Sequence, residues 1–341
     1  MRLSPRTSVN RATIAEDAGV ATFTATLSSV SSLPVTVDLG FTGTATLTAD
    51  YTRSGTQIVI AAGSLSGFVT VTAVPDTLFE GGETVVVDIT GVTNGTESGT
   101  QQATTTIADD DGAPTVTLAV DLANIAENGG VAKFTATLSH ASTQSVTVDL
   151  GFTGMATLTD DYTPSGTQIV IAPGSLSGFV TVTAVQDTLY EGHETVVVDI
   201  LAVTNGTETG VQQATTTIVD DDSPPTVTLT VDQATIAENG GVARFTATLS
   251  EVSGLPVTVD LGFTGSATAT DDYSPSGTQI VIAAGSLSGF VTVTAVQDNV
   301  YEGNETVAVH ITGVTNGTET GVQQATATIL DDDNPPMVTL S

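Results

Sequence analysis

Residues 145–152 read SVTVDLGF, a stretch in which Val146, Val148, Leu150 and Phe152 alternate with polar or small residues. Alternation with a period of two places the apolar side chains on one face of a strand and the polar side chains on the other. One buried face and one wet face are typical of a strand in a two-layered antiparallel β-sandwich. These eight residues therefore predict an all-β fold.

Six further segments around this strand are also short and rich in Val, Ile and Thr. They are TVTLAV, VAKFTATLS, TQIVIA, GFVTVTAV, TVVVDILAV and ATTTIV, at residues 115–120, 131–139, 167–172, 178–185, 195–203 and 214–219. Gly, Pro, Asn and Asp separate them, and none has the helical period of 3.6 residues. Seven short strands in about 110 residues are typical of an immunoglobulin-like sandwich. We expect Phe134, Phe152 and Phe179 to lie in its core.

The same unit of 111 residues occurs three times without an insertion, and we call each copy a repeat. A period this long is a whole domain, and it is long enough to bury its own core. The sequence therefore predicts three tandem, seven-stranded, immunoglobulin-like sandwiches in an extended array. The predicted domains are 1–111, where PRTSV replaces VTLAV and the first strand is degenerate, 112–222, 223–333, and the start of a truncated fourth repeat at 334–341.

The predicted linkers are GAP, SPP and NPP, which are short and stiffened by proline. We therefore expect the lower end of one sandwich to meet the upper end of the next. The Asn-Gly pairs at Asn94, Asn205 and Asn316 predict turns, although each also begins an N-x-T sequon.

Composition excludes several classes of function. The chain has 38 acidic and 6 basic residues, whereas nucleic-acid binding and attachment to anionic membranes both need basic patches. It has no run of 18 apolar residues, and its first ten residues, MRLSPRTSVN, lack the apolar centre of a signal peptide, so we expect no direct membrane insertion. The absence of Cys excludes disulfides, zinc–thiolate sites and thiol catalysis.

Acidic residues that are scattered in sequence gather at one end of the predicted sandwich. If consecutive strands run antiparallel, the first, third and fifth connections and the end of the last strand lie at the same end. In the second repeat these places hold Glu127, Asp160, Asp161, Asp187, Glu191, Glu194, Asp220, Asp221 and Asp222. Halophile-type charging would instead spread such residues over the strand faces, and a merely solvated acidic end is the other alternative.

Such a cluster favours a bound cation. Like charges about 4 Å apart repel by ~1 kcal/mol in water and by ~4 kcal/mol at an effective dielectric of 20. Ca²⁺ takes about six to eight oxygen ligands at irregular angles, whereas zinc and copper prefer His or Cys. The carboxylates exceed what one ion needs, so we predict two or more Ca²⁺ ions in each repeat.

Four motifs carry a family resemblance: IAEN at 125–128, DDY at 160–162, DTLYEGHE at 187–194 and the closing DDD at 220–222. With them, all three repeats resemble the Calx-beta domain found in sodium/calcium exchangers, an integrin beta subunit and large bacterial surface proteins. The resemblance implies eight calcium ligands in each repeat.

In the first repeat these ligands are Glu16, Asp50, Asp76, Glu80, Glu83, Asp109, Asp110 and Asp111. In the second repeat they are Glu127, Asp161, Asp187, Glu191, Glu194, Asp220, Asp221 and Asp222. In the third repeat they are Glu238, Asp272, Asp298, Glu302, Glu305, Asp331, Asp332 and Asp333. Asp160 is not included, because Ala49 stands at its position in the first repeat.

The leading hypothesis is a calcium-binding array that serves as a Ca²⁺-rigidified stalk or adhesion segment of a larger extracellular or cell-surface protein. Its partners would be calcium ions, the neighbouring repeats and a cell-surface or matrix ligand of the parent protein. Two alternatives stay open: a Ca²⁺ sensor that regulates a partner domain, and a passive spacer without a bound ion.

We do not expect an enzyme. GSLSG at 63–67 has Leu65 where a nucleophile elbow needs serine, and a glycosidase would need aromatic platforms although the chain has no Trp. His193 lies within the acidic motif, but Gly82 and Asn304 replace it in the other repeats, so we expect no ligand role for it.

Overall fold

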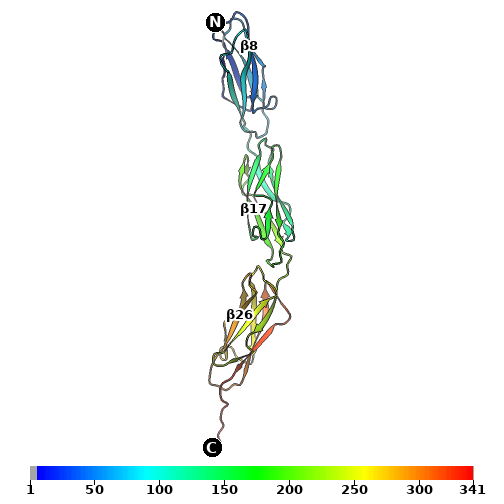
Figure 1. Cartoon of the computed structure of the whole chain (residues 1–341), viewed down its shortest axis with the longest axis vertical. Coiled ribbons are helices and arrows are strands. Elements are labelled where there is room, and N and C mark those ends of the chain that lie inside the picture. The colour runs from blue at the N-terminus through cyan, green and yellow to red at the C-terminus, as the bar shows by residue number, and fades with distance from the viewer. Residues whose placement is uncertain (1–5, 341) are drawn as a thin grey trace.

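The computed structural model describes residues 6–340. It shows three β-sandwiches joined end to end, with the two ends of the chain at opposite ends of an elongated molecule (Figure 1). This arrangement confirms the predicted all-β extended array. Within the described residues there is no helix that is long and apolar enough to cross a membrane.

The first repeat contains β1 (Arg6–Val9), β2 (Thr13–Ala15), β3 (Val20–Thr26), β4 (Val35–Gly43), β5 (Tyr51–Arg53), β6 (Gln57–Ile60), β7 (Ser66–Ala73), β8 (Glu83–Thr93) and β9 (Gln102–Ala108). The second contains β10 (Thr115–Val120), β11 (Asn124–Ala126), β12 (Val131–Leu138), β13 (Val146–Gly154), β14 (Tyr162–Pro164), β15 (Gln168–Ile171), β16 (Ser177–Ala184), β17 (Glu194–Thr204), β18 (Thr207–Glu208) and β19 (Gln213–Val219). The third contains β20 (Thr226–Val231), β21 (Thr235–Ala237), β22 (Val242–Leu249), β23 (Val257–Gly265), β24 (Tyr273–Pro275), β25 (Gln279–Ile282), β26 (Ser288–Ala295), β27 (Glu305–Thr315), β28 (Thr318–Glu319) and β29 (Gln324–Leu330).

Two sheets face each other in every repeat. In the second repeat their strand orders are β14-β16-β12-β10-β18 and β11-β19-β17-β13-β15. The inward positions of both sheets form one core around Phe134, which is fully buried. The seven predicted strands correspond to β10, β12, β13, β15, β16, β17 and β19.

Two strands of each sandwich change sheets along their length. In the second repeat β10 pairs with β12, but β11 runs parallel to β19 in the opposite sheet, with Ile125 beside Ile218. Likewise β14 pairs with β16, and β15 then pairs with β13. Each change of sheet occurs part-way along the sandwich, so the chain begins in one sheet and continues in the other.

The first strand of the first repeat, whose sequence pattern is degenerate, forms the short strand β1 in the described residues. β1 pairs with β3 in an antiparallel register that places Val9 opposite Phe23, because main-chain pairing does not depend on the lost alternation of side chains. The expected absence of a signal peptide rests partly on residues 1–5, which lie outside the described residues.

Residues 334–340, where a fourth repeat is predicted to begin, form no strand. Met337 and Val338 are exposed there.

The expectation that Phe179 lies in the core is wrong. This residue is 59% exposed, and the Lys133 Nζ atom lies 4.7 Å from the ring centroid. In β16 the apolar set that faces the core begins at Val180, so Phe179 points outward.

The turn predicted at Asn205 is confirmed. Asn205 has a φ of 59°, and its side-chain amide donates to the Ser145 carbonyl at 2.9 Å.

Candidate metal centre

The change of sheet between β10 and β11 brings Glu127 to the end of β19. Its backbone amide continues the parallel pairing and donates to the Val219 carbonyl at 3.1 Å, directly before the acidic triplet at 220–222. The matching amides are those of Glu16, which donates to Ala108 at 3.0 Å, and Glu238, which donates to Leu330 at 3.2 Å. The first ligand predicted in each repeat therefore lies beside the last three.

The Glu127 carboxylate joins two acidic segments. Its Oε1 atom accepts the amide of Asp187 at 3.2 Å, and its Oε2 atom accepts the amide of Asp221 at 3.4 Å. The side chain is buried, and burial raises the pKa of Glu127 although these two amides act in the opposite direction. Glu16 is likewise buried with a raised pKa.

Asp220 orders the connection between β16 and β17, which we call the E–F loop (residues 185–193). Its Oδ2 atom accepts the amides of Glu191 at 3.1 Å and Gly192 at 2.6 Å, and its Oδ1 atom accepts the amide of Asp222 at 2.9 Å. Gly192 has a φ of 76°, which explains glycine after the glutamate of the EGHE motif.

The third repeat shows the electrostatic effect of these amides. There the backbone N–H of Asp333, together with those of Gly303 and Glu302, lowers the pKa of Asp331 within an acidic cluster.

Asp161 lies directly before β14. Its carbonyl accepts the amide of Val185, where the E–F loop begins, at 2.9 Å. Ligand atoms of Asp161, Glu191 and Glu194 lie within 4.8 Å of one another. Burial, and secondly the charge and hydrogen bonding of Asp161, raise the pKa of Glu191 to about 7 and that of Glu194 to about 8.

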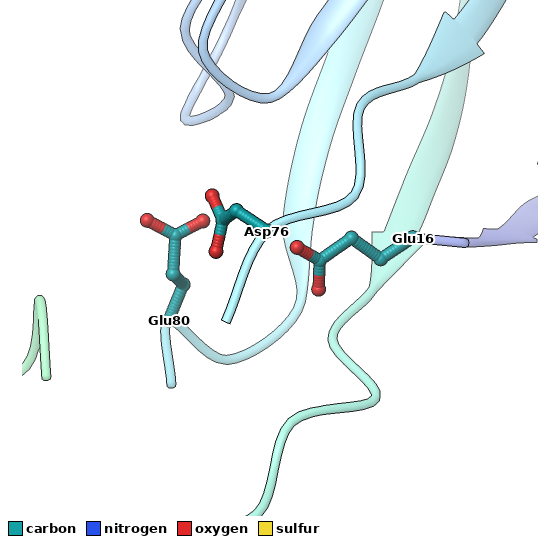
Figure 2. A group of neighbouring side chains, drawn as sticks. All are labelled: Glu16, Asp76 and Glu80. Atoms are coloured by element: carbon teal, nitrogen blue, oxygen red, sulfur yellow. The ribbon is translucent and has the colours of Figure 1, made fainter. Parts of the chain in front are cut away.

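The first repeat contains three overlapping groups of this kind. Figure 2 shows one of them, with the carboxyl groups of Glu16, Asp76 and Glu80 near one another. Each of the three groups has its ligand atoms within 4.8 Å: Glu16 with Asp76 and Glu80, Glu16 with Asp109 and Asp111, and Asp50 with Glu80 and Glu83. Because Glu16 and Glu80 are shared, the groups form one continuous array of oxygen atoms.

The other repeats have the same plan. In the second repeat Glu127 groups with Asp220 and Asp222, and a small pocket at this end is lined by Glu127, Asp161, Glu191, Glu194 and Asp220. In the third repeat the matching pocket is lined by Glu238, Asp272, Glu302, Glu305 and Asp331. The amide of Asp298 donates to the Oε1 atom of Glu238 at 3.3 Å, so it lies at the same end.

The middle residues of the acidic triplets are Asp110, Asp221 and Asp332, and none belongs to the groups of carboxylates described above. Asp110 is exposed. The Oδ1 atoms of Asp221 and Asp332 accept the side-chain amides of Gln186 and Gln297, each at 3.1 Å. Sequence reasoning did not identify these glutamines, although they share one repeat position. The His193 side chain is exposed.

The last residue of each triplet provides a direct test of whether a cation fits. The Oδ2 atoms of Asp111, Asp222 and Asp333 are buried without a hydrogen-bond partner. Burial first, and neighbouring carboxylates second, raise the pKa of each. A buried carboxylate oxygen without a partner is unfavourable unless a cation contacts it. Oxygen ligands from several loops, without Cys, match the preference of Ca²⁺.

The fold and this end of each sandwich define a tandem array of β-sandwich domains that gather carboxylates. A model of the Calx-beta domain family matches residues 5–111, 109–222 and 220–333. The chain therefore belongs to the Calx-beta family, which is not an enzymatic fold.

Several solved structures are similar. The structure of CBD12 from CALX1.2 is 16% identical, with 59% of this chain and 81% of that chain covered and a TM-score of 0.29. The apo-form Calx CBD1 domain is 20% identical, with coverages of 31% and 98% and a TM-score of 0.28. A tetra-tandem repeat in the extending region of a large adhesion protein is 16% identical, with coverages of 96% and 74% and a TM-score of 0.40. No match was found among curated proteins.

Proposed function

We propose that each repeat binds two or more Ca²⁺ ions at its carboxylate end. The observation that carries the proposal is the buried, unpartnered Oδ2 atom of Asp111, Asp222 and Asp333 within groups of carboxylates. Each of these three residues is the last of the eight predicted ligand positions in its own repeat. Bound Ca²⁺ would supply the positive charge that offsets the repulsion among the carboxylates.

The predicted ligands divide into two kinds by what the protein already gives them. Asp220 and Glu127 accept backbone amides, so they shape the loops as well as offering remaining lone pairs. The carboxylates of Glu191, Glu194 and Asp222 accept no backbone amide among the described hydrogen bonds, and their pKa values are raised, so the protein leaves their negative charges poorly compensated. We expect the negative charges of this second kind of ligand to depend most on a bound ion for compensation.

We further propose that the array is a Ca²⁺-rigidified stalk or adhesion segment of a larger extracellular or cell-surface protein. The supporting observation is the shape: three similar sandwiches follow one another along a single axis (Figure 1). The carboxylate ends of the first and second repeats lie at the two junctions, where bending would occur. A cell-surface or matrix ligand would belong to the parent protein.

Thermal melts test the calcium proposal. A ligand that binds only the native state stabilises it by RT ln(1 + [L]/Kd), roughly 2.7 kcal/mol at a hundredfold excess over Kd. We expect the melting temperature in millimolar Ca²⁺ to exceed that in chelator by several degrees, and calorimetric titration to give at least six ions per chain at two per repeat. An unchanged melting temperature would leave the passive spacer as the better account.

A Ca²⁺ sensor is the second candidate. It is favoured by one contact: the E–F loop of one repeat touches the next repeat, so an event at the site has a direct route to a neighbour. A sensor requires Ca²⁺ to change the mean arrangement of neighbouring repeats. A stalk requires Ca²⁺ only to reduce the range of arrangements that they adopt. Distance measurements across a junction with and without Ca²⁺ separate these two outcomes.

A further inference from the structure

Both junctions are built on the same contact. The E–F loop of one repeat, at residues 74–82 in the first repeat and 185–193 in the second, meets a loop at the upper end of the next repeat. At the first junction Ser142 Oγ donates to the Phe79 carbonyl at 2.8 Å. At the second, Ser253 Oγ donates to the Tyr190 carbonyl at 3.1 Å. Both serines are 1% exposed, and each pair forms an isolated parallel β-bridge.

The linker is held on the far side of each junction as well. The Pro114 carbonyl accepts the amide of Thr207 at 2.9 Å, and the Pro225 carbonyl accepts the amide of Thr318 at 2.9 Å. The acidic triplet holds the other end of the first linker, where the amide of Asp111 donates to Asp109 Oδ1. Only about two residues lie between this bond and the bond at the Pro114 carbonyl. Movement at a junction therefore depends on the loop-to-loop contact.

In the third repeat no described repeat follows this loop. Val300 and Tyr301 are 57% and 49% exposed there, whereas the matching Leu189 and Tyr190 are half-buried. The surface that each junction covers is thus partly apolar.

The first junction has two side-chain hydrogen bonds beyond this shared contact. Gln144 Nε2 donates to the Glu80 carbonyl at 2.6 Å. His140 Nε2 lies 3.0 Å from the Gly112 carbonyl in the linker, which can only accept, so Nε2 donates; its Nδ1 atom lies 3.0 Å from Ser139 Oγ. Gln144 therefore holds the E–F loop, and His140 holds the linker.

The second junction has Leu255 and Glu251 at these two repeat positions. Leu255 cannot donate a hydrogen bond, and it packs near Gly192 instead, with Cδ1 at 3.4 Å from where a Cβ would stand. Glu251 adds a negative charge near the acidic triplet, and its charge is one of the causes of the raised pKa of Asp222. At the first junction His140 acts in the opposite direction on the pKa of Asp111.

We infer that the two junctions are unequal. Gln144 and His140 fasten the first and second repeats together, and the junction between the second and third repeats is the joint at which the array bends. The inference deepens the proposed stalk role, but the contacts that carry it are between protein atoms, so it does not require a bound ion.

Spin labels test it, because the chain contains no Cys. Val59, Val170 and Val281 occupy the same repeat position and are 60%, 60% and 62% exposed. The double variant V59C/V170C reports on the first junction and V170C/V281C on the second, so equal junctions would give the same distance distribution. Two additional hydrogen bonds lead us to expect a bent fraction about tenfold smaller at the first junction.

Reciprocal exchange identifies the residues responsible. Gln144→Leu with His140→Glu should broaden the first distribution to resemble the second, and Leu255→Gln with Glu251→His should narrow the second. The matched control is Leu33→Gln with Ser29→Glu, at the same repeat positions in the first repeat, which no described repeat precedes; it should change neither distribution. Melts of each variant show whether its repeats stay folded.

Distance distributions of equal width at the two junctions of the parent chain overturn the inference. So do widths that stay unchanged when the residues are exchanged between the junctions. Each pair is measured in Ca²⁺ and in chelator. If Ca²⁺ narrows both distributions equally and they are the same in chelator, the calcium proposal stands and the unequal junctions do not. If the difference is present but Ca²⁺ changes neither distribution, the inference stands and the rigidifying role of calcium fails.

Discussion

The backbone amide of Gly192 donates to the Oδ2 atom of Asp220 at 2.6 Å, which fastens the E–F loop to the end of β19. Asp222, two residues further on, has a buried Oδ2 atom with no hydrogen-bond partner. Two residues of one acidic triplet therefore differ in their surroundings: Asp220 orders the loop, whereas the buried Oδ2 atom of Asp222 has no partner within the described protein.

This difference gives the first prediction. Asp220→Ala leaves three backbone amides without their acceptor, so it should destabilise the second repeat in chelator by roughly 1.5–3 kcal/mol, the range for hydrogen bonds to charged groups. Asp222→Ala removes a buried charge without a partner and should leave the same repeat equally or more stable. Hydrogen exchange of peptides from 115–219 in increasing urea measures both, and equal losses for the two variants would contradict the assignment.

The second prediction concerns pH in chelator. The folded-state pKa is about 8 for Glu83 and Glu194 and about 7 for Glu191, whereas an unfolded glutamate titrates near 4.3. Between these values the native state binds more protons than the unfolded state, so stability is full below about pH 4.3 for these groups and falls as pH rises through 7 to 8.

Urea melts at pH 6 and pH 8.5 measure this dependence. We expect lower stability at pH 8.5 in chelator and a much smaller difference in saturating Ca²⁺, because the ion replaces the proton as the partner of these carboxylates. Calcium affinity should rise over the same interval. Stability that increases with pH in chelator would show that the glutamates are compensated by the protein.

Glu194→Gln is the third test. It removes one charge from the group with Asp161 and Glu191, so it should weaken calcium binding in the second repeat while the calcium-free protein is unharmed or slightly more stable. The matched control is Asp160→Asn, which removes one charge from the same end at a position that is not a predicted ligand. Calorimetric titration should show weaker affinity or fewer ions for Glu194→Gln alone, and equal effects of both would mean that only total charge matters.

The fourth prediction concerns shape. With Ca²⁺ bound, the triplets at 109–111 and 220–222 hold the strand ends next to each linker, so the array should be extended with a narrow distribution of lengths. In chelator, repulsion among the carboxylates should release these ends. Small-angle scattering should show a longer maximum dimension in Ca²⁺ than in chelator, with Mg²⁺ having less effect because it dehydrates reluctantly. Identical curves in all three conditions would favour a passive spacer.

Alternation in sequence predicted the strands that are long enough to alternate. β11 and β14 have three residues each and β18 has two, so none carries a recognisable period. Alternation also says which face of a strand is buried but not which sheet the strand joins. The changes of sheet between β10 and β11 and between β14 and β15 were therefore not predicted. Phe179 is a different case: its aromatic character favours the core, but its position in the alternation of β16, next to the buried Val180, places it on the outward face.

The carboxylate end was predicted because it needs only strand direction, which the parity of the connections supplies. The partners of individual oxygen atoms depend on loop conformation and were not foreseen. The amides on Asp220 and the bond from Gln186 to Asp221 are examples. The predicted meeting of lower and upper ends agrees with the Phe79–Ser142 and Tyr190–Ser253 bridges, but the pattern of the sequence did not identify those residues.

The parallel pairing of β11 with β19 has a mechanical consequence. Tension along the array enters the second repeat through its first strands and leaves through the end of β19. Because β11 and β19 run in the same direction, such a pull slides them past each other, and the hydrogen bonds beside Ile125 and Ile218 are loaded together in shear rather than opened one at a time. The amide bond from Glu127 to Val219 continues that row into the carboxylate end. The element that resists extension and the site proposed to hold Ca²⁺ are therefore one continuous structure.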